Sequence, residues 1–231
     1  MSTMVSQQQQ VLVRMAARSL GRNGLAHAYG HCSLKLNDDE MLVCAPKPMG
    51  LLGPQDEGTV VPIQGPLPEG VLGEVRLHQR IYRQRPDIKG VCRSMPPALM
   101  TLSALGKVPR PRHGMGAYFW PQPAFWPQVD LIRQDEAADL AIAIMQDSPA
   151  LIMRGNGVVV CADDLRKACV LTWFLENAAS IELEAMRCGL ADQSLLSEAE
   201  AKSRAIWSGG IMERMWAWLT QGDEEQEKPT S

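Results

Sequence analysis

The sequence predicts an α/β protein whose strands do not follow the regular strand–helix–strand winding of a parallel sheet. Short apolar or alternating runs typical of strands are grouped, with turn residues between them, and runs with helical spacing lie between and after these groups. Grouping of this kind favours hairpins over a doubly wound parallel sheet. With 231 residues, 45% of them hydrophobic, the chain can bury a sizeable core.

The first half of the chain is expected to begin with a helix over 11–20, where apolar residues recur at helical spacing before two glycines. Residues 31–36 and 41–45 are predicted strands, and the Asn-Asp-Asp sequence between them is typical of a hairpin turn. A third strand is predicted over 60–63, and a helix over 73–85 is stopped by Pro86.

The second half is expected to hold buried strands over 89–93 and within 151–160, and helices over 136–145 and 165–187. Ser197 and Glu200 form a capping box that predicts a last helix through Trp218. The polar ends are expected to be flexible. The predicted organisation is a flexible N-terminus over 1–10, a single domain over 11–222 and a flexible tail over 223–231.

Charge and composition exclude several classes of partner. The net charge is −3 and the basic residues are scattered, which argues against nucleic acid. No apolar run reaches the roughly 20 residues that span a bilayer, and residues 1–10 lack the features of a signal peptide, so we expect a cytoplasmic protein with no membrane contact. The cysteines form no C-x-x-C pair and are interpreted as small buried hydrophobes. They are Cys32, Cys44, Cys92, Cys161, Cys169 and Cys188.

Six short motifs occur in an order that is typical of one enzyme family. They are Gly30-His31-Cys32-Ser33, the segment from Glu74 through His78 to Asp87, Val91-Cys92-Arg93-Ser94-Met95-Pro96-Pro97, His113-Gly114-Met115-Gly116-Ala117, Leu151 to Val160, and Asp163-Asp164. Over roughly residues 10–190 the chain therefore resembles the class II aldolase/adducin head domain family. The resemblance implies a three-layer α/β/α sandwich with a mainly antiparallel central sheet, assembled as a homotetramer with active sites between subunits.

The resemblance also implies a divalent metal held by three histidines, but this chain has Arg93, Met95 and Asn156 at those positions. A protonated arginine ligates nothing, and a thioether and an amide do not make a zinc or manganese site. We therefore expect a degenerate metal site and no cofactor. A substitute site from His31, His78 and His113 is conceivable, although histidines at such places are more often hydrogen-bonded or substrate-facing.

Two residues are candidate catalytic groups. The resemblance places Glu74 at the acid/base of the family, and the alternative is an ordinary solvated glutamate on a helix. Arg93 supplies a fixed positive charge that could replace the metal in anchoring an anion. Alternatively, Arg93 pairs with Glu74 as an inert salt bridge that fills the vacated cavity.

The expected substrate is a small carboxylate. Sugar-phosphate members of the family carry neutral phosphate donors where this chain has His31, Ala45-Pro46-Lys47-Pro48 and Leu72-Gly73, so a phosphorylated sugar is disfavoured. Cationic groups suit a carboxylate better. The aromatic run Tyr118-Phe119-Trp120 either lines the binding site of an aromatic or apolar part of the substrate or belongs to a subunit interface or the core. The candidate substrate-binding residues are His31, Lys47, His78, Asn156 and Tyr118.

Two functions remain open at this point. The first is a metal-independent lyase that performs aldolase-type carbon–carbon cleavage or decarboxylation of a small carboxylate. The second is a non-catalytic binding or scaffold protein, as the adducin branch of the family suggests. The apolar C-terminal region with Trp207, Trp216 and Trp218 also predicts a homo-oligomer.

Overall fold

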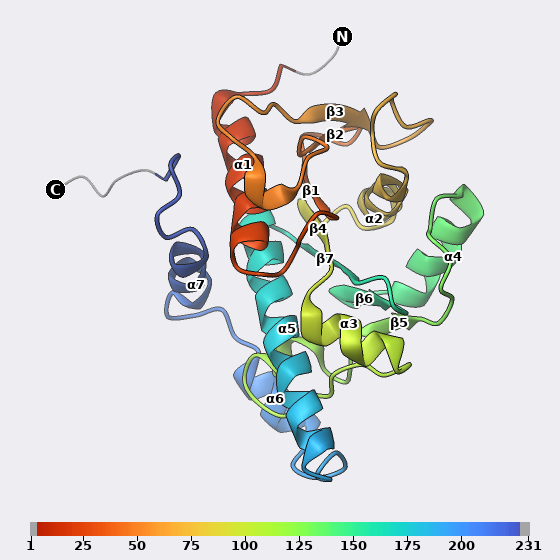
Figure 1. Cartoon of the computed structure of the whole chain (residues 1–231), viewed down its shortest axis with the longest axis vertical. Helices are drawn as coiled ribbons and strands as arrows, with labels where there is room; N and C mark the ends of the chain where they lie inside the picture. The colour runs from red at the N-terminus through yellow and green to blue at the C-terminus, as the bar shows by residue number, and fades with distance from the viewer. Residues whose placement is uncertain (1–3, 227–231) are drawn as a thin grey trace, which may run out of the picture.

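The structure, a computed structural model, describes residues 4–226, and in this part of the chain seven strands form one sheet (Figure 1). All neighbouring strands are antiparallel except for the pair at one edge, β5 and β6, which is parallel. The mainly antiparallel sheet is therefore confirmed. In spatial order the strands are β3 (Thr59–Pro62), β2 (Glu40–Val43), β1 (His31–Lys35), β4 (Gly90–Ser94), β7 (Val158–Ala162), β6 (Ala150–Met153) and β5 (Ala124–Trp126).

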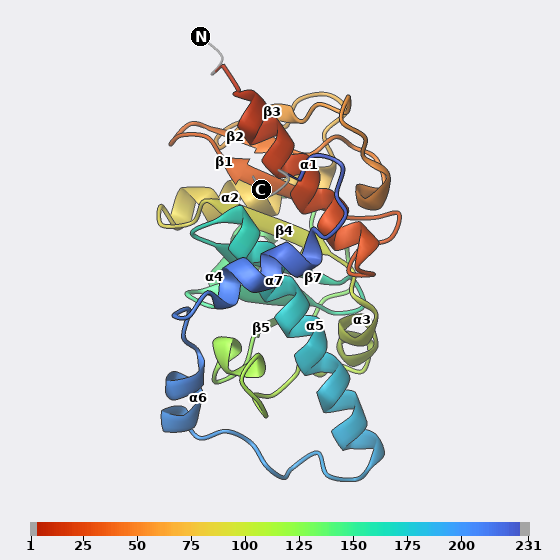
Figure 2. The ribbon, with the colours of Figure 1, turned by 90° about the vertical axis from the view of Figure 1, so that its left-hand side faces the viewer.

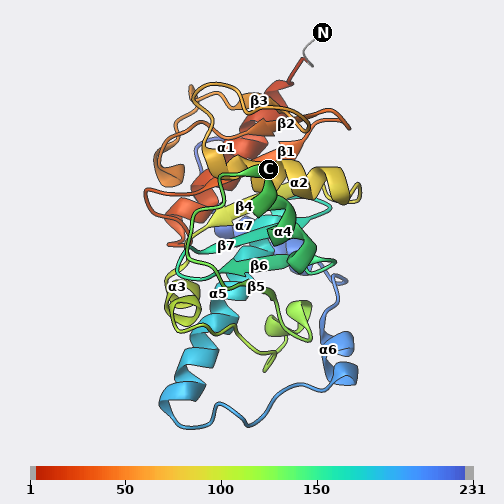
Figure 3. The same cartoon turned by 90° about the vertical axis from the view of Figure 1, so that its right-hand side faces the viewer.

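Helices cover both faces of the sheet. Four of them, α1 (Gln7–Arg22), α3 (Pro97–Ala104), α5 (Leu165–Arg187) and α7 (Ile211–Leu219), pack on one face (Figure 2). The helices α2 (Arg76–Gln84) and α4 (Asp135–Met145) cover the other (Figure 3). Successive strand residues point to opposite faces, so Cys92 packs with the first group and Val91 with the second. The predicted three-layer sandwich is confirmed.

The predicted elements differ from the observed ones in several places. Helix α1 begins at Gln7 because Ser6 and Gln9 form a capping box that the apolar pattern does not reveal. Neither α3 nor the three-residue edge strand β5 was predicted. The expected last helix is two helices, α6 (Glu198–Arg204) and α7, because Gly209 and Gly210 between them adopt positive φ values of 76° and 69°.

The described part of the expected flexible tail is anchored to α1. Asp223 accepts two hydrogen bonds from the buried Arg18 at 2.7 and 2.6 Å, and Glu225 accepts hydrogen bonds from Arg14 at 2.8 and 2.6 Å. Charge-assisted contacts of this kind hold residues 223–226 against the domain. The remainder of the predicted tail, residues 227–231, lies outside the described residues, as do residues 1–3.

Much of the apolar surface of the C-terminal region is used inside the subunit. Met215 and Trp216 pack against the core, and Trp218 makes an edge contact with Trp173 and stays half exposed. The predicted oligomer is therefore not required by this surface and stays a prediction.

All six cysteines lie within the described residues and none forms a disulfide; five are buried and Cys188 is exposed. Within residues 4–226, no helix has the length and apolarity that crossing a bilayer requires.

Candidate active site

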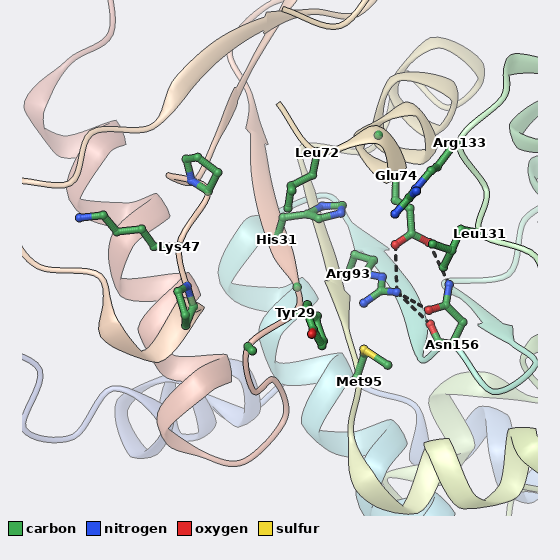
Figure 4. A pocket seen from close by; sticks show the side chains of 15 residues that line it. Tyr29, His31, Lys47, Leu72, Glu74, Arg93, Met95, Leu131, Arg133 and Asn156 are labelled. Atoms are coloured by element: carbon green, nitrogen blue, oxygen red, sulfur yellow. Dashed lines mark hydrogen bonds and ion pairs between the residues drawn. The ribbon is translucent and has the colours of Figure 1, made fainter. Parts of the chain in front are cut away.

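A cavity of about 620 Å³ opens where β4 ends and β1 begins (Figure 4). The antiparallel register places His31, the first residue of β1, directly opposite Arg93 near the end of β4. Both side chains lie on the face of the sheet that α2 covers, and both line the cavity together with Glu74 and Asn156. The structure thus brings together four of the residues that the sequence singled out.

Glu74, Arg93 and Asn156 contact one another at one wall of the cavity. Arg93 Nη2 lies 3.1 Å from Glu74 Oε2 and donates to the side-chain oxygen of Asn156 at 2.7 Å and to its backbone oxygen at 3.2 Å. The Asn156 amide in turn donates to Glu74 Oε1 at 2.9 Å (Figure 4). Each of the three side chains therefore fixes the other two.

The turn between β6 and β7 delivers Asn156 to this wall. Gly157 has a φ of +76°, and a Cβ there would lie 2.1 Å from the backbone oxygen of Ser94. Only glycine permits both the left-handed backbone and this close approach. Glu74 lies in the 3-10 turn over Gly73–Val75 that leads into α2, and its side chain contacts Arg93 from that turn.

Arg93 is buried but only partly satisfied. Its side chain is 3% exposed, and each of its contacts is made through Nη2. Nε is buried without a partner, and Nη1 has none among the described residues. Burial lowers the pKa of the guanidinium, and the adjacent Glu74 carboxylate opposes that effect. Arg93 is thus a cation with unpaired N–H donors, which an anion-binding group requires.

His31 and His78 are both neutral. His31 Nδ1 lies 3.0 Å from His78 Nε2, and both rings are buried. Burial lowers the pKa of His78 to about 3, with Arg93 adding to the effect. Burial, His78 and Arg93 together hold the pKa of His31 well below its usual value. An uncharged imidazole therefore lines the cavity at the pH of the cell.

Three of the predicted site residues lie elsewhere than expected. His78 is fully buried behind His31 and does not line the cavity. Lys47 lines the rim, but its side chain points away from Glu74 and Arg93 (Figure 4), and its ammonium group pairs with Asp56 at 2.5 Å. Tyr118 does not line this cavity, because its ring packs against Trp207 and Phe174 at centroid distances of 4.6 and 5.4 Å and its hydroxyl donates to the backbone of Ile206. Neither His78 nor Tyr118 therefore lines the cavity of the single chain.

Sequence reasoning missed Arg133. Its aliphatic stem lies over Gly73, where a Cβ would come 3.2 Å from Arg133 Cγ, and the residue lines the cavity next to Glu74 (Figure 4). Its guanidinium has no hydrogen bond or ion pair to any other described residue. The segment from Asp130 to Gln134 carries no motif, so only the folded chain shows that an unpaired cation reaches the site.

The residues present do not fit the divalent metal that the family implies. Arg93 places a cation where a ligand would stand, and the Asn156 side-chain oxygen already accepts a hydrogen bond from it. Met95 contributes a thioether, which suits hard or borderline metals poorly. His113 is bonded to Asn177 at 2.9 Å and lies outside the cavity. Within residues 4–226, no three His, Cys, Asp or Glu side chains are grouped to hold a metal ion.

Comparison with known proteins agrees with this architecture. A family model described as Class II Aldolase and Adducin N-terminal domain matches residues 11–183. The chain belongs to this family. The resemblance inferred from the six motifs is thereby confirmed, and four of the six motifs contribute residues to the cavity described above.

Relatives and solved structures cover nearly the whole chain. The protein named 3,4-dihydroxyphthalate decarboxylase from Arthrobacter keyseri is 27% identical over 89% of each chain. Its namesake from Terrabacter sp. (strain DBF63) is 25% identical over 81% of this chain and 85% of that one. Among structures, L-fuculose 1-phosphate aldolase from Glaciozyma antarctica PI12 has a TM-score of 0.76 at 18% identity and covers 98% of this chain and 97% of that one. An aldolase II superfamily protein from Pseudomonas syringae has a TM-score of 0.77 at 20% identity, covering 94% and 92%. The structural likenesses show the fold.

Proposed function

We propose that this protein is a lyase that decarboxylates a small carboxylate substrate without a bound metal. The observation that carries the proposal is the position of Arg93: a buried cation with unpaired donors stands beside Glu74 in the cavity. The relatives named decarboxylase, which align over most of the chain, support this reaction over aldol cleavage of a sugar phosphate.

The charges around the cavity favour an anionic substrate. Arg93 and Arg133 both line it, and Arg133 has no partner in the part of the chain that the structure describes. Glu74 supplies the negative charge on this wall, and His31 is uncharged. A substrate such as 3,4-dihydroxyphthalate, after which the relatives are named, carries two carboxylates that the two guanidinium groups suit.

The proposed reaction needs a stabilised anion and one proton. Glu74, having taken a proton from solvent, gives it to the substrate ring carbon that carries the carboxylate. The bond between that carbon and the carboxylate then breaks, CO₂ leaves, and the electron pair of the broken bond restores the aromatic ring. Arg93 stabilises the negative charge that this pair returns to a conjugated substrate oxygen. The Asn156 amide holds Glu74 in place.

One observation favours a second candidate, a binding or scaffold protein without activity. Glu74, Arg93 and Asn156 contact one another, as they would in a metal cavity filled by a salt bridge. Such a protein would keep the fold and lose turnover. The two candidates differ in whether the pocket binds and converts a carboxylate.

The decisive experiment incubates purified protein with 3,4-dihydroxyphthalate and measures CO₂ and the dihydroxybenzoate product by mass spectrometry. L-Fuculose 1-phosphate serves as the matched substrate for aldol cleavage. The proposal expects CO₂ release and no cleavage of the sugar phosphate. Tight binding of the dicarboxylate without turnover would favour the scaffold candidate instead.

A further inference from the structure

Four buried side chains form a hydrogen-bond chain that begins at the cavity and ends between β1 and α2. His31 Nδ1 contacts His78 Nε2 at 3.0 Å, and His78 Nδ1 contacts Ser33 Oγ at 2.7 Å. Ser33 Oγ contacts the Tyr82 hydroxyl at 2.9 Å, and that hydroxyl donates to the backbone oxygen of Ser33 at 2.9 Å. None of the four side chains is more than 3% exposed.

The last contact gives this chain a direction. A carbonyl oxygen can only accept, so the single proton of the Tyr82 hydroxyl goes to the backbone of Ser33. The Ser33 hydroxyl then donates to Tyr82, and His78 Nδ1–H donates to Ser33. A neutral His78 with its proton on Nδ1 has a bare Nε2, so His31 Nδ1–H donates to it. The proton of His31 therefore lies on Nδ1, and its Nε2 carries a lone pair.

The reversed arrangement satisfies fewer contacts. If Ser33 donated to His78, then His78 Nε2–H would donate to His31 and His31 would carry its proton on Nε2. In that case the Ser33–Tyr82 contact would have no proton of its own, because Tyr82 has already donated to the backbone. The forward direction places one proton in each contact and is favoured by one buried hydrogen bond.

We propose that His31 presents an unprotonated Nε2 to the cavity as a fixed hydrogen-bond acceptor, and that this acceptor receives a hydroxyl group of the carboxylate ligand. Nε2 is buried and has no partner in residues 4–226, and the ring projects from β1 on the side of the cavity that carries Glu74 and Arg133 (Figure 4). A buried acceptor without a donor is costly until a ligand supplies one.

The acceptor on His31 defines the ligand more narrowly than the charges of the two arginines alone. Arg93 and Arg133 select for carboxylate, and His31 selects for a hydroxyl on the same molecule. This assignment rests on the proposed function only for the carboxylate, since the proton positions follow from the protein alone. His31 is thus a specificity-determining residue, and His78, Ser33 and Tyr82 are positioning residues that act through it.

The proton positions are measured directly by NMR on protein labelled with ¹⁵N-histidine, using two-bond nitrogen–proton correlations at neutral pH. His27→Gln and His113→Gln variants assign the remaining signals to His31 and His78. Both rings are expected to carry the proton on Nδ1. A proton on Nε2 of His31 in the wild-type protein overturns the inference.

Removal of the Tyr82 hydroxyl should reverse the chain. In Tyr82→Phe the Ser33 hydroxyl keeps only His78 Nδ1 as an acceptor among its present partners, so both histidines are expected to move their protons to Nε2. Tyr118→Phe removes a hydroxyl outside the chain and should leave both tautomers unchanged. Unaltered tautomers in Tyr82→Phe would mean that the hydroxyl does not direct the chain.

The ligand preference is tested by calorimetric titration with 3,4-dihydroxybenzoate and with benzoate, which lacks the hydroxyls. Wild-type protein and Tyr118→Phe are expected to bind the dihydroxy compound roughly 3–10-fold more tightly, as one hydrogen bond allows, and Tyr82→Phe should lose most of that preference. Equal affinity for the two compounds in wild-type protein refutes the inference. The Nδ1 tautomer and the hydroxyl preference in a protein that releases no CO₂ support it and refute only the proposed function.

Discussion

Replacement of Arg93 by methionine tests whether this arginine anchors the substrate anion in the proposed decarboxylation. The Arg93 side chain is 3% exposed and its partner Glu74 is 15% exposed, so the pair is nearly buried. Loss of one partner of such a pair leaves the other charge unpaired and is expected to cost about 2–4 kcal/mol of stability. Removal of a charge that stabilises the developing anion is expected to lower turnover by at least about 10²–10³-fold.

The assay combines CO₂ release from 3,4-dihydroxyphthalate with urea unfolding of Arg93→Met, Glu74→Gln and the double variant. Because the two side chains act together, the double variant should turn over hardly more slowly than either single one. It should also lose less stability than the sum of the single losses, since no unpaired charge remains. Arg154→Met, which changes an exposed arginine of the neighbouring turn outside the cavity, is the matched control.

The opposite result would refute this reasoning. If Arg93→Met is more stable than the wild-type protein and retains substrate binding and turnover, the arginine only fills the space that a metal occupies in other members of the family. Glu74 and Asn156 would then be its structural partners, and the catalytic role assigned to Arg93 would be wrong.

Three further predictions follow from the same structure. Burial lowers the pKa of His78 to about 3, so in the unfolded chain this imidazole takes up a proton below its ordinary pKa of 6.5 that it does not take up in the folded protein. The free energy of unfolding should therefore fall by at least about 2 kcal/mol as the pH falls from 7.5 to 5, and His31, whose pKa is also lowered, adds to the loss. A flat profile in urea unfolding would contradict this. Arg133→Ala should raise the dissociation constant for phthalate about tenfold or more without lowering the melting temperature, since it removes an unpaired charge-assisted donor; an effect no larger than that of Arg154→Ala would count against it. The family resemblance predicts a homotetramer, and light scattering that shows a monomer at micromolar concentration would rule this out.

Much of the fold could be predicted because hydrophobic periodicity reports local structure. The helix over Leu165–Arg187 has the bounds that the pattern predicts, and the strand preceding Arg93 was found from its apolar run. Strand β5 was missed because three residues carry no periodicity, and it exists through pairing with β6. The break before α7 does not follow from the pattern, because the capping box at Ser197 predicts where a helix begins and says nothing of where it ends. The two glycines that interrupt the helix, Gly209 and Gly210, adopt positive φ values only in the folded chain.

The site could be predicted only where a motif carried it. Glu74, Arg93 and Asn156 stand at matched positions of recognisable segments, and the structure brings them into contact. Tyr118 was assigned from its aromatic neighbours alone, and packing against Trp207 directs it elsewhere. No sequence motif marks Arg133, which is a single arginine in a loop. It reaches the cavity because its side chain packs over the backbone of Gly73, a contact that exists only in the folded chain.

The most direct test of the central claim is turnover of 3,4-dihydroxyphthalate by protein whose metal content is measured in the same sample. We expect CO₂ release from protein with substoichiometric transition metal, at a rate and with a melting temperature that chelator leaves unchanged. About one metal ion per chain, with activity lost on chelation and restored by that metal, would contradict it.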